Sequence, residues 1–260
     1  MQLKFRTCAG YILGNLWMDF KLRNPDRIPF RKCSLQWLAI FGSLLFFAVS
    51  AVAQGLPEGF VYVDEYIPNA VVELRYYGKD NFMGRRAKGY RSPRCILTEK
   101  AANALKNVQA ELKNFGLGIK IFDAYRPQRA VNHFVRWAKD LSDMLMKEKY
   151  YPEEEKRSLF KKGYIADKSS HSRGSTVDLT LVNKAPGEEP QELDMGTEFD
   201  FFGPQSWPTY LLISAQARAH RMLLQKIMVE NGFIPYFAEW WHFTLKNEPF
   251  PDQYFDFPIE

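Results

Sequence analysis

Apolar and polar residues alternate along residues 176–181, where Val177, Leu179 and Leu181 alternate with two threonines and Asp178. A period of two is typical of a β-strand with one apolar face, and it places Asp178 on the opposite face. Short apolar runs with turn residues at their ends predict further strands near residues 60–63, 71–74, 119–122 and 241–245.

Other segments repeat their apolar residues every three to four positions, which is the period of an amphipathic helix. Thr98 is placed to cap one such helix, and Pro127 suits the first helical position of a second. A third helix is expected near residues 215–231, where Gly232 would stop it. The expected inward faces are Ala101, Leu105, Val108 and Leu112 in the first helix, and Val131, Phe134, Val135, Ala138 and Leu141 in the second.

The order of these elements indicates the fold class. Strands and helices do not alternate regularly along the chain, as they would in a doubly wound parallel sheet. The sequence therefore predicts an α+β fold, with a mainly antiparallel sheet flanked by helices.

The N-terminal segment has the layout of a secretory signal. Arg31 and Lys32 precede an apolar run over residues 37–49, and the run is followed by the small-residue pattern Ala-Val-Ala at residues 51–53. This layout predicts cleavage before Gln54. An uncleaved membrane anchor is the alternative, although two serines and a glycine keep the strongly apolar stretch short for a spanning helix.

We therefore divide the chain into an N-terminal extension with a signal peptide or anchor, residues 1–53, and a folded domain, residues 54–260. Under either interpretation the domain is exported, and the periplasm is its expected location. A membrane is an expected partner only through the leader, if the leader stays uncleaved.

The basic excess of the chain belongs to this leader. The formal net charge is +5, and residues 1–53 contain seven Lys or Arg against two Asp. The remaining residues are neutral, with 28 basic and 28 acidic side chains, so no nucleic-acid partner is predicted. Cys95 is the only cysteine after residue 53, which excludes an intrachain disulfide in the processed chain.

Candidate metal ligands occur in the segment S-x-H-x-x-G-x-x-x-D, which contains His171 and ends at Asp178. If Gly174 turns the chain, the loop histidine and the strand carboxylate can point to one place. A second imidazole would complete a site with three ligands and an open fourth position, as catalytic zinc requires.

His242 in the segment Glu-Trp-Trp-His can supply that imidazole. Glu239 lies three positions earlier, so on a regular strand the two side chains would face opposite ways. We expect Glu239 at the bend where the strand begins, close to the metal without binding it. A carboxylate there can accept a proton from water and deliver it to a leaving amine.

Less specific interpretations exist for each of these residues. A lone loop histidine is more often a surface residue than a ligand, and His133 and His220 fall on the polar faces of predicted helices. A structural ion pair between Arg126 and either Asp178 or Glu239 is a further alternative to a catalytic site. The combination of the two metal motifs with a separate Tyr-Arg-Pro is more specific than any one of them.

These motifs resemble those of the D-alanyl-D-alanine dipeptidases of the vancomycin-resistance type, within the wider group of zinc D,D-peptidases. The resemblance extends from about Val61 to the C-terminus. It is carried by residues 80–82, 123–132, 168–175, 199–201, 239–242 and 254–258.

The resemblance implies a fold of the zinc D,D-peptidase and Hedgehog type and one Zn²⁺ per chain. It implies that His171, Asp178 and His242 bind the metal and that Glu239 acts as general base and acid. Arg126 would donate to the scissile carbonyl oxygen as that oxygen becomes an oxyanion.

The resemblance also implies a pocket for a small dipeptide. Its lining is expected to include Tyr76, Tyr90, Ser169, Ser170 and Asp200. Asp200 suits the ammonium of the substrate, and the hydroxyl groups suit its carboxylate. Recognition of both termini would restrict the enzyme to a dipeptide.

The function that follows is hydrolysis of D-alanyl-D-alanine to two D-alanine, in cell-wall dipeptide turnover or salvage. One alternative is a D,D-carboxypeptidase that acts on peptidoglycan stem peptides. Another is a non-catalytic, zinc-stabilised binding module.

Overall fold

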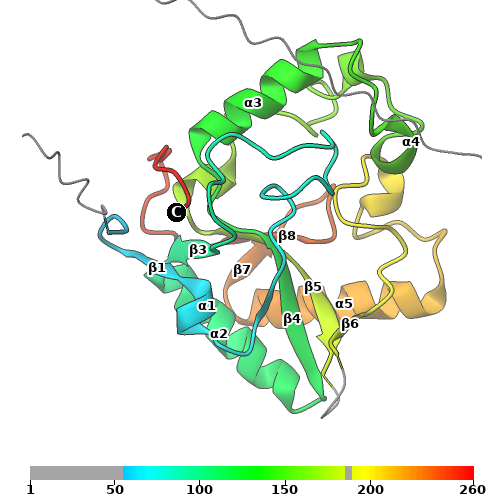
Figure 1. Ribbon diagram of the computed structural model, residues 1–260. Helices are drawn as coiled ribbons and strands as arrows, with labels where there is room; N and C mark the ends of the chain where they lie inside the picture. Colours follow the sequence, from blue (N-terminus) through cyan, green and yellow to red (C-terminus); the bar gives the residue numbers. More distant parts are fainter. Residues whose placement is uncertain (1–54, 185–188) are drawn as a thin grey trace, which may run out of the picture. The chain divides into compact units, whose positions relative to one another are not determined.

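A mixed sheet with the strand order β2-β4-β5-β8-β7 forms the centre of the fold (Figure 1). The computed structural model describes residues 55–184 and 189–260. All pairs along this path are antiparallel except β2 with β4, and β6 pairs antiparallel with β5. The strands of this sheet are β2 (Val71–Val72), β4 (Leu117–Asp123), β5 (Thr176–Asn183), β6 (Gln191–Glu192), β7 (Phe233–Pro235) and β8 (His242–Leu245).

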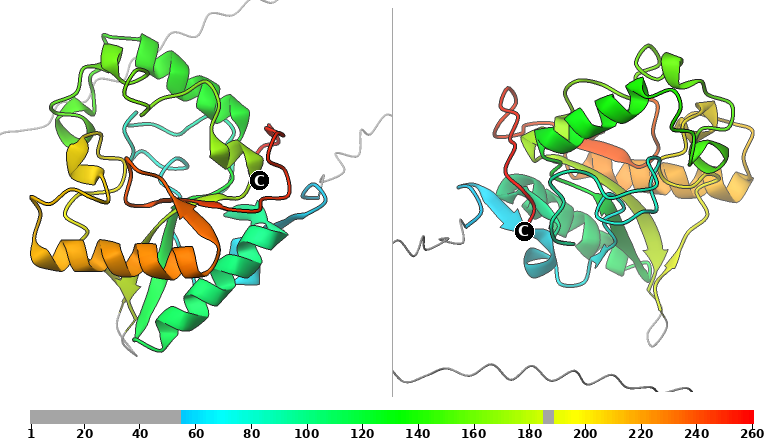
Figure 2. Two further views of the ribbon diagram at one scale, coloured as in Figure 1. Left: turned by 180° about the vertical axis from the view of Figure 1, so that it is seen from behind. Right: turned by 45° about the horizontal axis from the view of Figure 1, so that its top comes forward.

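A separate two-stranded antiparallel sheet joins β1 (Phe60–Tyr62) to β3 (Ile96–Thr98). Two long helices, α2 (Glu99–Lys113) and α5 (Ala215–Glu230), lie on one face of the main sheet and contact each other (Figure 2). The remaining helices are α1 (Val63–Tyr66), α3 (Gln128–Lys139) and α4 (Lys147–Tyr150), with short 3₁₀ turns η1 (Lys156–Ser158), η2 (Ser170–Arg173) and η3 (Pro204–Ser206). The predicted α+β class with a mainly antiparallel sheet is confirmed.

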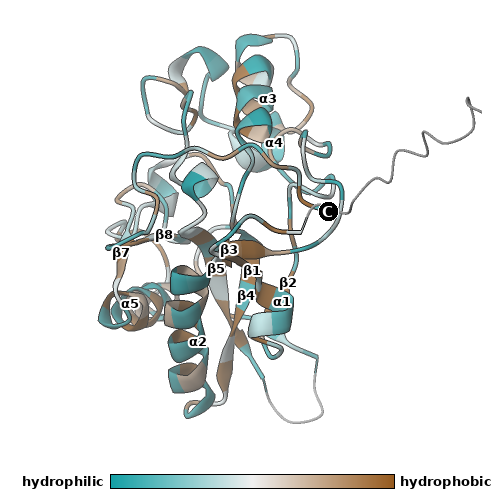
Figure 3. Ribbon diagram, turned by 90° about the vertical axis from the view of Figure 1, so that its left-hand side faces the viewer, coloured by the Kyte–Doolittle hydropathy of each residue, from teal (hydrophilic) through white to brown (hydrophobic). Residues whose placement is uncertain are grey.

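Helix α2 follows its sequence pattern closely. The Thr98 hydroxyl accepts a hydrogen bond from the backbone N–H of Ala101, which satisfies one of the free donors at the helix start. The four predicted inward residues of this helix are fully buried. Figure 3 shows apolar strands at the centre of the fold and hydrophilic residues on the outer turns of α2.

Helix α3 departs from its prediction at both ends. Pro127 is the residue that precedes the helix rather than its first helical residue. The helix ends at Lys139, because the Asp140 carboxylate accepts hydrogen bonds from the backbone N–H and the hydroxyl of Ser142 and so favours a turn. The assignment of Leu141 to the inward face is therefore wrong, and its side chain is 53% exposed.

Strand β5 is the structural basis of the site. Its residues from Thr176 to Val182 are all buried, and the strand is an interior one, with β4 on one side and β8 on the other. Asp178 is paired in register with Asp123 of β4 and with His242 of β8. The centre of the sheet thus brings together residues that are far apart in the sequence.

The predicted leader, residues 1–53, lies outside the described part of the chain. Over residues 55–184 and 189–260, no helix combines the length and the apolar character that a membrane span requires.

We predict different costs for alanine at two glycines with positive φ. Gly116 has φ +69 and open space where a Cβ would lie, whereas at Gly174, with φ +83, a Cβ would lie 2.3 Å from Cε1 of Phe60. The strained backbone alone should cost Gly116→Ala about 1–2 kcal/mol of unfolding free energy. Gly174→Ala should lose a further 1–3 kcal/mol or so from the steric overlap. Urea unfolding measures both, and equal losses would contradict the close approach of Phe60.

Candidate active site

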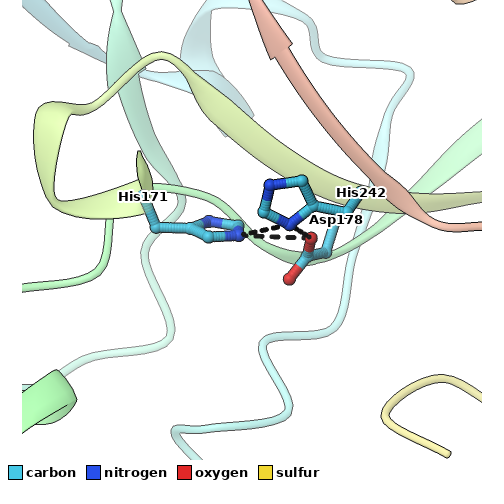
Figure 4. A group of neighbouring side chains, drawn as sticks. All are labelled: His171, Asp178 and His242. Carbon is cyan, nitrogen blue, oxygen red and sulfur yellow. Dashed lines mark hydrogen bonds and ion pairs between the residues drawn. The ribbon is translucent and has the colours of Figure 1, made fainter. Parts of the chain in front are cut away.

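Three side chains from three elements meet at one point (Figure 4). His171 comes from η2, Asp178 from β5 and His242 from β8. Oδ1 of Asp178 lies 3.2 Å from Nε2 of His171 and 3.1 Å from Nδ1 of His242, and these two nitrogens are 3.3 Å apart. The structure thus brings together the three residues predicted as metal ligands.

Local backbone geometry explains the seven-residue spacing of the first two. The Ser169 hydroxyl accepts a hydrogen bond from the backbone N–H of His171, which starts the short turn η2. Gly174 ends the turn in the left-handed conformation that glycine adopts most readily. The chain then enters β5 directly, with Asp178 on the face toward His171.

Hydrogen bonding fixes the protonation of His171. Its Nδ1 lies 2.7 Å from the backbone oxygen of Ala124. A carbonyl can only accept, so Nδ1 carries the proton and Nε2 presents a lone pair. Oδ1 of Asp178 is also buried and accepts no hydrogen bond from any residue that the structure describes. Two lone pairs therefore face each other at close range, an arrangement that a cation would stabilise.

The separations of the donor atoms fit zinc. Tetrahedral coordination with bonds of about 2.0–2.1 Å places neighbouring ligand atoms about 3.3–3.4 Å apart. The three observed separations, 3.1–3.3 Å, are close to this value. Two imidazoles and one carboxylate leave the fourth position of such a site open.

The electrostatic environment favours the metal-binding forms of His171 and Asp178, whereas at His242 burial is outweighed by the hydrogen bond and charge of Asp178, which raise the pKa. Burial lowers the pKa of His171, so its ring is neutral. Burial raises the pKa of Asp178, but positive charge or a donated proton at His171 and His242 outweighs burial and lowers it below the usual value, so a cation at this point favours the ionised carboxylate. A neutral imidazole and an ionised carboxylate are the species that coordinate zinc.

Glu239 lies in the turn just before β8, at the predicted bend, with Oε2 3.4 Å from Nδ1 of His242. Burial raises the pKa of Glu239 to about 7, against the opposing influence of His242. A carboxyl group with this pKa can exchange protons at neutral pH.

Arg126 contacts the carboxylate of Asp178 at Oδ2, the oxygen that the two histidines do not face. Its Nε donates to Oδ2 of Asp123 at 2.8 Å, and its Nη2 lies 3.4 Å from Oδ2 of Asp178. The ion pair with Asp178 that we considered as an alternative is therefore present. It does not compete with the metal cluster, because the two histidines face Oδ1 and Arg126 faces Oδ2.

A cavity of about 530 Å³ opens beside this cluster. Its lining includes Tyr76, Arg126, Ser169, Ser170, Asp178, Asp200, Glu239 and His242. Most of the residues predicted for the metal, the chemistry and the substrate thus share one cavity.

Asp200 is the second buried carboxylate of the cavity. Its Oδ1 accepts a hydrogen bond of 2.9 Å from the Tyr76 hydroxyl, while Oδ2 is buried and has no hydrogen-bond partner among the described residues. Burial, together with the charge of Asp178, raises the pKa of Asp200 well above its usual value. The position therefore lacks a positive group, such as an ammonium, that would stabilise the ionised carboxylate.

Comparison with known proteins identifies the family. A family model described as D-Ala-D-Ala dipeptidase, peptidase family M15, matches residues 57–260. The chain belongs to this family. Its members are zinc-dependent hydrolases, in agreement with the cluster of His171, Asp178 and His242.

Two relatives cover the same region. A D-alanyl-D-alanine dipeptidase of Enterococcus faecalis is 42% identical over 78% of this chain and 100% of its own length. One of Enterococcus faecium is 40% identical over 78% of this chain and 98% of its own. A solved vancomycin-resistance D,D-pentapeptidase with Zn(II) is 14% identical over 61% of this chain and 77% of that chain, with a TM-score of 0.36.

One residue predicted by the resemblance to this dipeptidase family lies elsewhere. Tyr90 is not among the residues that line the cavity, and its side chain is buried. Its hydroxyl donates a hydrogen bond of 2.6 Å to Oδ1 of Asp123. In this structure the Tyr90 hydroxyl therefore binds Asp123, and its predicted contact with the substrate stays a prediction.

Asp123 is the residue that the sequence interpretation missed. It is fully buried at the end of β4 and accepts hydrogen bonds from both Tyr90 and Arg126. It thereby holds the guanidinium in place over the cavity. The one available signal was its position, three residues before Arg126 and at the end of an apolar strand.

The two histidines interpreted as non-functional lie outside the cluster. Nδ1 of His133 accepts a hydrogen bond from the backbone N–H of Lys88 at 3.3 Å. Nδ1 of His220 donates to the backbone oxygen of Asp194 at 2.7 Å. Both make local contacts that need no metal.

Proposed function

We propose that this chain hydrolyses D-alanyl-D-alanine to two D-alanine, with His171, Asp178 and His242 as the ligands of one zinc ion. This choice of substrate is supported by two relatives that are named D-alanyl-D-alanine dipeptidase and are matched over nearly their whole lengths. The observation that carries the proposal is a buried oxygen of Asp200 that has no hydrogen-bond partner within residues 55–184 and 189–260 and lies in the same cavity as Asp178 and His242. A free dipeptide has the ammonium that this oxygen lacks.

In the proposed mechanism Glu239 and Arg126 have separate roles beside the zinc ion. When bound, zinc supplies Lewis-acid polarisation and makes water more acidic. Glu239 removes a proton from the attacking water and later delivers a proton to the leaving amine. Arg126 donates hydrogen bonds to the scissile carbonyl oxygen as negative charge develops there.

Substrate recognition is proposed to use both ends of the dipeptide. Asp200 accepts the ammonium, with Tyr76 fixing the orientation of its carboxylate through the 2.9 Å hydrogen bond. The hydroxyls of Ser169 and Ser170 line the cavity on the side of η2 and suit the substrate carboxylate. A longer, N-blocked peptide has no ammonium to place against Asp200, so it should be a poor substrate.

We predict that Glu239→Gln lowers kcat for D-alanyl-D-alanine by roughly 10²–10⁴-fold, because the amide cannot accept the proton from water. Zinc content, measured by mass spectrometry, should stay at one ion per chain. Glu230→Gln, on the exposed side of α5, is the matched control and should keep full activity. An active Glu239→Gln enzyme would remove Glu239 from the mechanism.

The proposed substrate is tested by offering the zinc-loaded protein two substrates, D-alanyl-D-alanine and an N-blocked muramyl pentapeptide. Release of D-alanine should occur from the dipeptide and not from the pentapeptide, because only the dipeptide has the free ammonium. Release from the pentapeptide with an intact dipeptide would favour the D,D-carboxypeptidase. Zinc binding without cleavage of either would favour the binding module.

We also propose that the enzyme acts outside the cytoplasm, in the periplasm, on dipeptide released by cell-wall turnover. The basic and apolar pattern of residues 31–53 supports this location. Cell fractionation should find the protein in the periplasm with residues 1–53 removed. A cytosolic protein that retains these residues would contradict the proposal.

A further inference from the structure

Arg221 of α5 is a buried charge that the proposed mechanism does not use. Its side chain is 3% exposed, and no carboxylate within the described ranges forms an ion pair with it. Burial lowers its pKa to about 10. Buried arginines are normally paired with an acidic group, because an isolated buried charge is costly. Backbone carbonyls take the place of that acidic group here.

Its hydrogen bonds all go to one loop. Nε donates to the backbone oxygen of Met195 at 2.7 Å, Nη1 to that of Trp207 at 2.8 Å, and Nη2 to that of Gln205 at 2.9 Å. We call residues 195–207 the Asp200 loop, since Asp200 lies near its middle. Arg221 therefore joins the two ends of the loop, which lies beside α5 in Figure 2.

The loop holds Asp200 in an unfavourable backbone conformation. Asp200 has φ +64, and it is the only non-glycine residue with positive φ among the residues described. Left-handed backbone is strained for a residue with a side chain, so the surrounding contacts must maintain it. Among those contacts, the hydrogen bonds from the Arg221 guanidinium to the loop backbone come from a charged donor.

The same loop is also tied to the strand start that follows Glu239. The indole N–H of Trp240 donates to the Thr197 hydroxyl at 2.8 Å, and its backbone N–H donates to the oxygen of Ser206 at 3.0 Å. The Ser206 hydroxyl donates to the backbone oxygen of Phe201 at 2.6 Å, next to Asp200. Arg221 closes this network from the helix side, since its Nη2 lies 3.5 Å from the Thr197 hydroxyl.

We propose that Arg221 is a positioning residue that fixes Asp200 for the substrate ammonium and so sets the preference for a free dipeptide. The proposal rests on the proposed function. Arg221 itself does not touch the cavity; it acts through the backbone of the Asp200 loop. Its loss should therefore affect recognition of the ammonium more than the chemical step.

The test compares two substrates that differ only in the ammonium, D-alanyl-D-alanine and N-propionyl-D-alanine. In Arg221→Gln, KM for the dipeptide should rise roughly tenfold or more, because the buried bonds that hold the loop are lost. The kcat/KM for N-propionyl-D-alanine should change less than about threefold. The ratio of kcat/KM for the dipeptide to that for N-propionyl-D-alanine should therefore fall.

Arg218→Gln is the matched control. Arg218 lies on the same helix and also donates to two backbone oxygens, those of Leu211 and Ile213, but these are outside the Asp200 loop. This variant should keep the wild-type preference between the two substrates. Equal losses on both substrates in Arg221→Gln, or a preference unchanged as in Arg218→Gln, would overturn the proposal.

Two further variants keep the test decisive if Arg221→Gln does not fold. Thr197→Val removes the hydroxyl that joins Arg221 to Trp240 and should shift the preference in the same direction. In an Asp200→Asn background the ammonium site is already lost, so Thr197→Val should change the preference between the two substrates little further. A further loss of preference as large as that in the wild-type background would overturn the proposal. A wild-type protein that leaves D-alanyl-D-alanine intact would overturn the proposed function instead, so the two failures are distinguishable.

Discussion

The site depends on one electrostatic constraint, the convergence of lone pairs at the centre of the sheet. The carbonyl of Ala124 takes the only proton of a neutral His171, and so forces Nε2 to face Oδ1 of Asp178 without a proton between them. Burial prevents water from relieving this contact. Under the proposed function a zinc ion would satisfy these atoms together with His242, so that metal binding and the local fold would stabilise each other.

The charged groups around the cluster approach it at different atoms, and only Glu239 comes close to an atom that faces the metal position, Nδ1 of His242. Arg126 contacts the other oxygen of Asp178 and is held by Asp123, while Glu239 approaches from the turn before β8. Two carboxylates with raised pKa, Glu239 and Asp200, therefore occupy one cavity in different roles. Glu239 is suited to exchange a proton and Asp200 to hold a cation.

The sequence predicted those features that depend on local spacing. The alternation around Asp178 located β5, and the Ser-x-His and Glu-x-x-His motifs located the histidines of the cluster and the position of Glu239 at a bend. Tyr90 was assigned to the pocket by resemblance alone. Its actual partner, Asp123, could not be predicted, because their contact depends on how two distant segments pack.

Arg221 shows the same limit more clearly. Along α5 it has the same appearance as Arg218 and Lys226, and a charged residue on a helix is usually solvated. Only the three-dimensional fold places the carbonyls of a distant loop over one of these side chains and leaves another exposed. Interactions of this kind are visible in the structure and absent from any periodic pattern.

The most direct test of the central claim is X-ray absorption at the zinc edge of the purified protein, in the wild type and in Asp178→Ala. We predict one zinc in the wild type, surrounded by nitrogen and oxygen atoms at about 2.0–2.1 Å with the scattering of two imidazoles. Asp178→Ala should lose most of this zinc. A wild-type protein that binds no zinc, or one whose zinc environment is unchanged in Asp178→Ala, would contradict the account.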